Sequence, residues 1–94
     1  MAGRVTWTAE AAEEARALLA APSLDGVGHK ILRIGIGSCG LRRPVAAPAP
    51  VEAGDETLEV DGVPVAIAGT LTGTFHLTLG RGRFGAWLNV EHRP

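Results

Sequence analysis

The stretch Thr57–Ala68 reads TLEVDGVPVAIA and indicates a β-hairpin in the second half of the chain. The dipeptide Asp61-Gly62 is typical of a two-residue hairpin turn, because both of its residues tolerate the positive φ that such turns need. The flanking segments, Thr57–Val60 and Val63–Ala68, are short and rich in residues that favour strands. The fold is therefore expected to contain antiparallel strands joined by tight turns.

Upstream of this hairpin, the segment Ala9–Ala21 predicts one amphipathic helix. Its apolar residues recur at helical spacing and form one face. Thr6 or Thr8 is placed to cap the first turn, and three glutamates follow where the helix dipole favours negative charge. Pro22 predicts the end of the helix, because proline cannot continue it.

The remaining segments predict short strands. Val5–Thr8 and Lys30–Gly37 precede the hairpin, and Val45–Val51 contains two prolines, so any strand there lies at a sheet edge or is irregular. Thr74–Leu79 and Phe84–Val90 alternate in hydropathy around a turn at Gly80–Arg83. Together these segments predict an α+β fold, with one N-terminal helix packed on short, mostly antiparallel strands. We expect one domain over residues 1–94.

Composition narrows the function. The chain has 94 residues, is 46% hydrophobic and has a formal net charge of -1, so neither a nucleic-acid footprint nor a polybasic membrane patch is expected. No apolar run approaches the roughly 20 residues of a membrane span. A single cysteine excludes an internal disulfide and fits a reducing compartment, so we expect a cytoplasmic protein. So small a core requires either efficient burial or pairing with a second copy, and we expect a homodimer.

Four pieces of the sequence, in order and spacing, resemble the HesB-like family of A-type iron–sulfur carriers. They are VTWTAEAA (residues 5–12), LRIGIGSCG (32–40), DETLEVDGVPV (55–65) and GAWLNV (85–90). The resemblance implies the HesB-like fold, a dimer, and a role in iron–sulfur cluster assembly with client proteins. It also implies three cluster thiolates, one in the glycine-rich loop and two in a Cys-Gly-Cys segment beyond the last strand. Only the loop cysteine is matched here, as Cys39.

Cys39 is the candidate ligand for iron or for a [2Fe–2S] cluster, which needs about four ligands, mostly thiolates. A symmetric dimer would supply two thiolates, and His76, His92 or an external thiol would complete the set. A second interpretation makes Cys39 a reactive thiol, since Arg42 and Arg43 follow it closely and positive charge favours thiolate. A third makes it a small buried residue at a strand end.

The histidines are not placed in the sequence at metal-ligand spacing from one another or from Cys39. His76 alternates with apolar neighbours and is expected on the outward face of its strand. His92 lies where the family keeps cluster ligands. For each, a structural or exposed histidine is the competing interpretation.

Other motifs have simpler explanations. Two glycine patterns, beginning at Gly35 and Gly80, match the dinucleotide fingerprint, but that motif requires a helix to begin inside it. Arg81-Gly82-Arg83 is expected to be a solvated turn. The acidic residues around the hairpin are expected to face water; they are Asp55, Glu56, Glu59 and Asp61. We find no catalytic constellation and do not expect an enzyme.

Two hypotheses follow. The first is a degenerate HesB-like protein that binds or assembles iron or an iron–sulfur cluster through Cys39 in a dimer. The second is a non-metal interaction or thiol-reactive regulatory module on the same fold, with Pro44–Pro50 and Arg81–Arg83 as contact surfaces.

Overall fold

The structure is a computed structural model that describes residues 3–21, 31–36 and 43–94. One helix and seven strands follow in the order β1 (Val5–Trp7), α1 (Ala9–Ala20), β2 (Leu32–Ile36), β3 (Pro44–Pro48), β4 (Glu56–Val60), β5 (Val63–Ile67), β6 (Thr74–Gly82) and β7 (Gly85–Arg93). The α+β class expected from the sequence is therefore observed.

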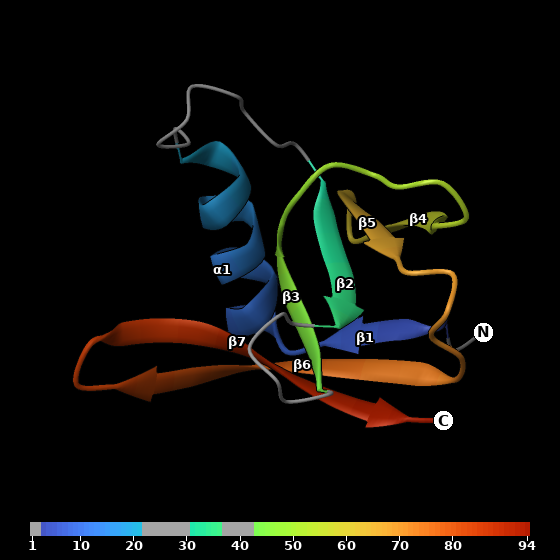
Figure 1. Ribbon diagram of the computed structural model, residues 1–94. Coiled ribbons are helices and arrows are strands. Elements are labelled where there is room, and N and C mark those ends of the chain that lie inside the picture. Colours follow the sequence, from blue (N-terminus) through green and yellow to red (C-terminus); the bar gives the residue numbers. More distant parts are fainter. Residues whose placement is uncertain (1–2, 22–30, 37–42) are drawn as a thin grey trace.

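The strands form two sheets. One has three strands in the order β1-β6-β7, and the other has four in the order β3-β2-β5-β4. In Figure 1 the four-stranded sheet and α1 lie on one side of the three-stranded sheet, and the β6–β7 hairpin extends past the N-terminal end of α1. The helix contacts β6 and β7 of one sheet and β3 and β5 of the other, so it packs where the two sheets meet.

Both sheets are mixed, which refines the expectation of mostly antiparallel strands. The antiparallel pairings are β2–β3, β4–β5 and β6–β7, while β1–β6 and β2–β5 are parallel. The parallel pairs join strands that are distant in sequence, and a strand's own alternation carries no information about the direction of such a partner.

Helix α1 begins at Ala9, as expected, and of the two candidate caps it is Thr8 whose side-chain oxygen accepts a hydrogen bond of 3.2 Å from the backbone N–H of Ala11. This satisfies one of the free amides of the first turn. The helix buries small residues, Ala11, Ala12 and Ala15, against the sheets. Small side chains allow the helix to lie close to the strands that it covers.

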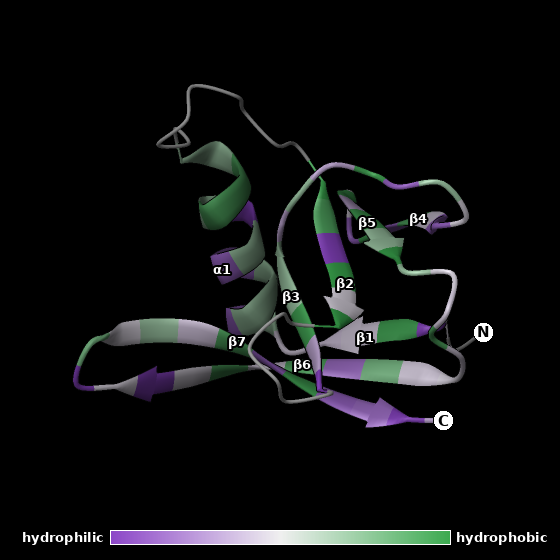
Figure 2. Ribbon diagram, in the orientation of Figure 1, coloured by the Kyte–Doolittle hydropathy of each residue, from purple (hydrophilic) through white to green (hydrophobic). Residues whose placement is uncertain are grey.

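The core lies between the two sheets and the helix. Phe75, Leu32, Ile34, Ile67, Leu77 and Val65 are its largest fully buried side chains. They come from β2, β5 and β6, and Figure 2 shows apolar residues on these strands and on α1. The C-terminal end of β7 is hydrophilic in the same figure. Polar side chains are therefore gathered at this end of the three-stranded sheet.

The hairpin at Asp61-Gly62 is confirmed. Both residues have positive φ, 50° and 79°, and Val60 and Val63 are register partners. The turn predicted at Gly80–Arg83 is placed differently: β6 continues through Gly82, and the turn is Arg83-Phe84. The last strand was expected to begin at Phe84, but β7 begins at Gly85, so Phe84 lies outside it. It lies at the tip and is 98% exposed.

The edge position expected for the proline-rich segment is also confirmed. Among the described strands, β3 pairs with β2 alone and lies at one edge of the four-stranded sheet. Prolines at an edge leave the interior ladders intact, because proline lacks the N–H that a central strand must donate.

Candidate functional site

Cys39 lies outside the described residues. The strand ends that bracket its segment are described, and Ile36 of β2 is the register partner of Pro44 of β3. Ile36 and the nearby Val45 are each 47% exposed. The described strand residues on either side of residues 37–42, Ile36 and Pro44, therefore lie side by side at a sheet end that carries exposed apolar side chains.

His92 has structural partners. Its ring stacks on Phe75, with 4.7 Å between the ring centroids and 5° between the planes. Its Nε2 lies 2.6 Å from the carbonyl oxygen of Thr72. A carbonyl oxygen can only accept a hydrogen bond, so Nε2 carries the proton and has no lone pair to offer a metal in this arrangement.

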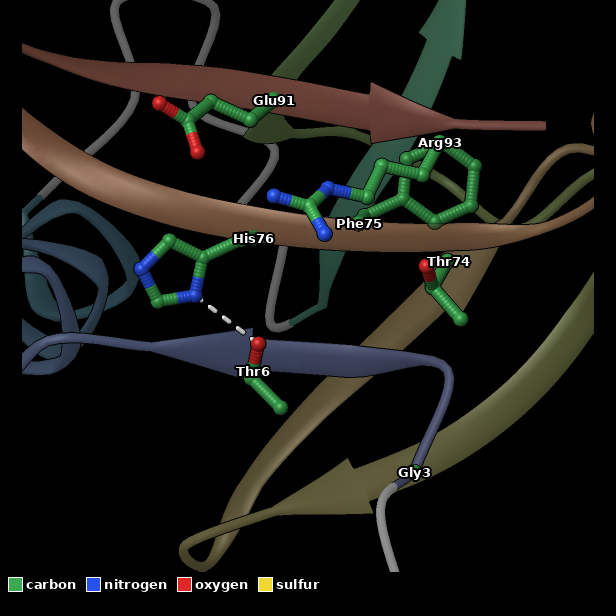
Figure 3. A pocket seen from close by; sticks show the side chains of 7 residues that line it. All are labelled: Gly3, Thr6, Thr74, Phe75, His76, Glu91 and Arg93. Carbon is green, nitrogen blue, oxygen red and sulfur yellow. Dashed lines mark hydrogen bonds between the residues drawn. The ribbon is translucent and has the colours of Figure 1, made fainter.

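His76 lies half-buried on the outward face of β6, as expected. Its Nδ1 is 2.8 Å from the hydroxyl oxygen of Thr6 on β1. Figure 3 shows this hydrogen bond, which orients the ring. The other ring nitrogen, Nε2, does not take part in it. The two histidines do not meet, because His76 pairs with Glu91 and His92 with Phe75, and successive residues of a strand face opposite sides.

A hollow that polar and apolar atoms both line surrounds His76 on this outward face. It has a volume of about 310 Å³ and is lined by Gly3, Thr6, Thr74, Phe75, His76, Glu91 and Arg93. Three strands contribute, since Thr6 pairs with His76 and His76 pairs with Glu91. We call it the His76 hollow. Sequence reasoning found His76 but missed Thr6, Glu91 and Arg93, which only the register brings to its side.

Within residues 3–21, 31–36 and 43–94, no group of three or more His, Cys, Asp or Glu side chains is placed to hold a metal ion. In the same part of the chain, no helix has the length and apolar character needed to span a membrane.

The acidic residues near the first hairpin do not all face water, contrary to expectation. Asp55 has only 1% of its side chain exposed and accepts two hydrogen bonds from Arg33 at 2.7 and 2.9 Å. It also accepts one from the backbone N–H of Glu52 at 3.0 Å. Hydrogen bonds from Arg33 hold the pKa of Asp55 below its ordinary value, and the same bonds raise the pKa of Arg33.

Two further acidic residues near this hairpin have partners from the N-terminal part of the chain. Glu56 forms an ion pair with Arg4 at 2.9 Å, and Asp61 accepts a hydrogen bond of 2.7 Å from the indole N–H of Trp7. Such partners are far apart in sequence, and nothing in the local pattern pairs them. These contacts tie β1 to the β4–β5 hairpin and have a structural role.

The β6–β7 hairpin presents an aromatic tip. Phe84 is 98% exposed, and Trp87 is 49% exposed with its ring lying over Gly80 and Gly82 of β6. The indole N–H of Trp87 donates to the side-chain oxygen of Asn89 at 2.8 Å. Arg81 belongs to β6 rather than to a turn and pairs with Glu10 of α1 at 3.2 Å. The glycine pattern from Gly80 is thus a strand surface that accommodates an indole, and no helix begins within it.

No family model matches this chain, and a search of curated proteins found no match to it.

Proposed function

We propose that this protein is a degenerate HesB-like protein that binds iron or an iron–sulfur cluster as a homodimer in the cytoplasm. Cys39 of each copy supplies a thiolate to a shared metal. The four sequence pieces that resemble the family support this, and so does an α+β fold in which the corresponding hairpin closes at Asp61-Gly62.

The observation that carries the proposal is the register pairing of Ile36 with Pro44. It brings together the two ends of the segment that contains the chain's only cysteine. Ile36, 47% exposed at one of those ends, offers apolar surface to a second copy. Two thiolates at such a contact match the softness that iron–sulfur chemistry requires.

The remaining ligands would come from His76 or from an external thiol, such as that of a client protein in cluster assembly. His92 is the weaker candidate, because its Nε2 donates to the carbonyl of Thr72. His76 keeps Nε2 outside its bond to Thr6. The ligand set therefore rests first on Cys39.

The test is anaerobic reconstitution with ferrous iron and sulfide, followed by measurement of bound iron and visible absorbance. We expect wild type to gain iron and a charge-transfer band, and Cys39→Ser to gain neither. Ser38→Ala, which changes the adjacent residue and keeps the thiol, is the matched control and should behave as wild type. Equal iron in wild type and Cys39→Ser would refute the proposal.

A second candidate function is favoured by Phe84. An aromatic side chain that is 98% exposed at a hairpin tip, with Trp87 and arginines nearby, has the composition of a protein-interaction surface. In this alternative the chain is a non-metal interaction module, with a second copy as its first testable partner. Sedimentation should show self-association of wild type that Phe84→Ser weakens, with Val51→Ser as the exposed apolar control. A concentration-independent monomer in wild type would exclude this form of the alternative.

In the thiol-reactive form of the same alternative, Cys39 acts without metal. Alkylation rates measured against pH would give the pKa of the thiol. A pKa near the ordinary value of about 8.5 would remove that form, because a reactive thiol needs thiolate at neutral pH.

A further inference from the structure

The outward face of the three-stranded sheet carries two rows of polar side chains. Thr6, His76 and Glu91 form one row across β1, β6 and β7, and Thr74 and Arg93 form the next. Residues two apart on a strand share a face, so the rows lie side by side. Figure 3 shows these side chains around the His76 hollow, with the Arg93 guanidinium extending toward His76.

Glu91 and Arg93 are the acidic and the basic side chain that line the hollow. Arg4, Arg33 and Arg81 each have a carboxylate partner within 3.2 Å. Neither Arg93 nor Glu91 takes part in an ion pair in residues 3–21, 31–36 and 43–94, although they are neighbours on one face of β7. Their backbones are about 7 Å apart, two residues along a strand. One cation and one anion thus border the same hollow.

We propose that the His76 hollow binds a small zwitterion, a free α-amino acid, with its carboxylate on Arg93 and its ammonium on Glu91. Arg93 and Glu91 then each have a ligand group of opposite charge. A simple anion would leave Glu91 facing negative charge, and a simple cation would leave Arg93 facing positive charge, and each such mismatch weakens binding. The guanidinium fork suits a carboxylate because it can donate two parallel hydrogen bonds.

Threonine and histidine groups complete the polar lining. Thr74 is the register partner of Arg93 and brings a hydroxyl to the carboxylate side of the hollow. His76 is held by its 2.8 Å bond to Thr6 and is the register partner of Glu91. A ring fixed in this way loses little side-chain entropy when a ligand arrives. The volume of about 310 Å³ accommodates a small amino acid.

The experiment is an NMR titration of the ¹⁵N-labelled full chain with glycine, acetate and methylammonium separately. For so small a ligand at an open site, we expect glycine to bind with a Kd on the order of 1–10 mM. The saturable shifts should centre on the amides of Thr74, Phe75 and His76. Acetate and methylammonium, which carry one charge each, should bind about tenfold more weakly.

Two variants and one control sharpen the test. Arg93→Gln and Glu91→Gln should each weaken glycine binding about tenfold, because each leaves one ligand charge without a partner. Arg83→Gln, at the hairpin turn away from the hollow, should bind as wild type. The dispersion of each spectrum establishes that the variant is folded. The proposal is overturned if glycine causes no saturable shift at these amides, if acetate binds as well as glycine, or if both variants retain wild-type affinity.

Discussion

Arg33 of β2 and Asp55, in the connection from β3 to β4, form a two-pronged ion pair, with Nε–Oδ2 at 2.7 Å and Nη2–Oδ1 at 2.9 Å. Asp55 has 1% of its side chain exposed, and Arg33 has 18%. Glu52 adds a second carboxylate 3.2 Å from Nη1 of Arg33 and donates its backbone N–H to Asp55. The pair fastens the long β3–β4 connection onto the four-stranded sheet.

The first prediction is that Asp55 makes folding stability depend on pH in the acid range. Hydrogen bonds from Arg33 lower the pKa of Asp55 below its ordinary 3.8, so the folded state takes up this proton less readily than the unfolded state. The stability that Asp55 contributes is therefore complete above about pH 4 and is lost as the pH falls through the lowered value. Asp55→Asn removes this titration, since asparagine does not ionise.

Urea unfolding of wild type and Asp55→Asn between about pH 6 and pH 2 measures the effect. The variant should be less stable at neutral pH, and the gap between the two should narrow as the pH falls. Glu13→Gln, which removes an exposed carboxylate from α1, is the control. Its free energy of unfolding should stay close to that of wild type at every pH. A constant gap between wild type and Asp55→Asn would contradict this reading of the pair.

A second prediction separates two glycines that both have positive φ, Gly62 at 79° and Gly73 at 90°. A Cβ added at Gly62 meets nothing within 4 Å, whereas one added at Gly73 would collide with the backbone carbonyl of Arg93. Gly62→Ala should therefore lower the free energy of unfolding by about 1–2 kcal/mol, through backbone strain alone. Gly73→Ala should lower it by about 3 kcal/mol or more, because backbone must also move. If urea unfolding gave the same loss of free energy for Gly62→Ala and Gly73→Ala, the expected collision at Gly73 would be contradicted.

A third prediction concerns Gly80, whose missing side chain leaves space for Trp87. An added Cβ would collide with the indole ring, which is a movable side chain and not backbone. Gly80→Ala should displace the ring and break the 2.8 Å hydrogen bond to Asn89, at a loss of stability below about 1.5 kcal/mol. The measurement is the indole N–H resonance of Trp87, which should move while that of Trp7 stays in place. An unmoved Trp87 resonance would show that the ring does not lie over Gly80.

Short-range chemistry made the local elements predictable. Asp61-Gly62 predicts its hairpin because positive φ is a property of those two residues. Thr6 and Thr8 together predict the helix start to within one turn, because a cap bond such as that of Thr8 spans only three residues. The sequence predicts the second turn too early, at Gly80–Arg83, because glycine is a residue type that turns favour. In the structure Gly80 and Gly82 remain in the strand and accommodate Trp87.

The site was predictable only in part. Alternation places His76 on the outward face, but the parallel pairing of β1 with β6 brings Thr6 beside it across 70 residues. Asp55 was expected in water because an acidic residue near a turn usually is solvated. Its partner Arg33 lies 22 residues earlier on another strand, and no periodicity within either segment joins them. Pairings of this kind depend on register, which local sequence does not encode.

The fourth prediction contrasts the two phenylalanines of the chain. Phe75 is 2% exposed, belongs to the core and stacks on His92, while Phe84 is 98% exposed at the hairpin tip. Phe75→Ala should lower the free energy of unfolding by about 3–5 kcal/mol, through lost burial and the cavity left behind. Phe84→Ala should change it by no more than about 0.5 kcal/mol, because the ring makes few contacts to lose. Urea unfolding at low protein concentration measures both in the monomer, and a loss above about 1 kcal/mol for Phe84→Ala would mean that the ring packs against the chain.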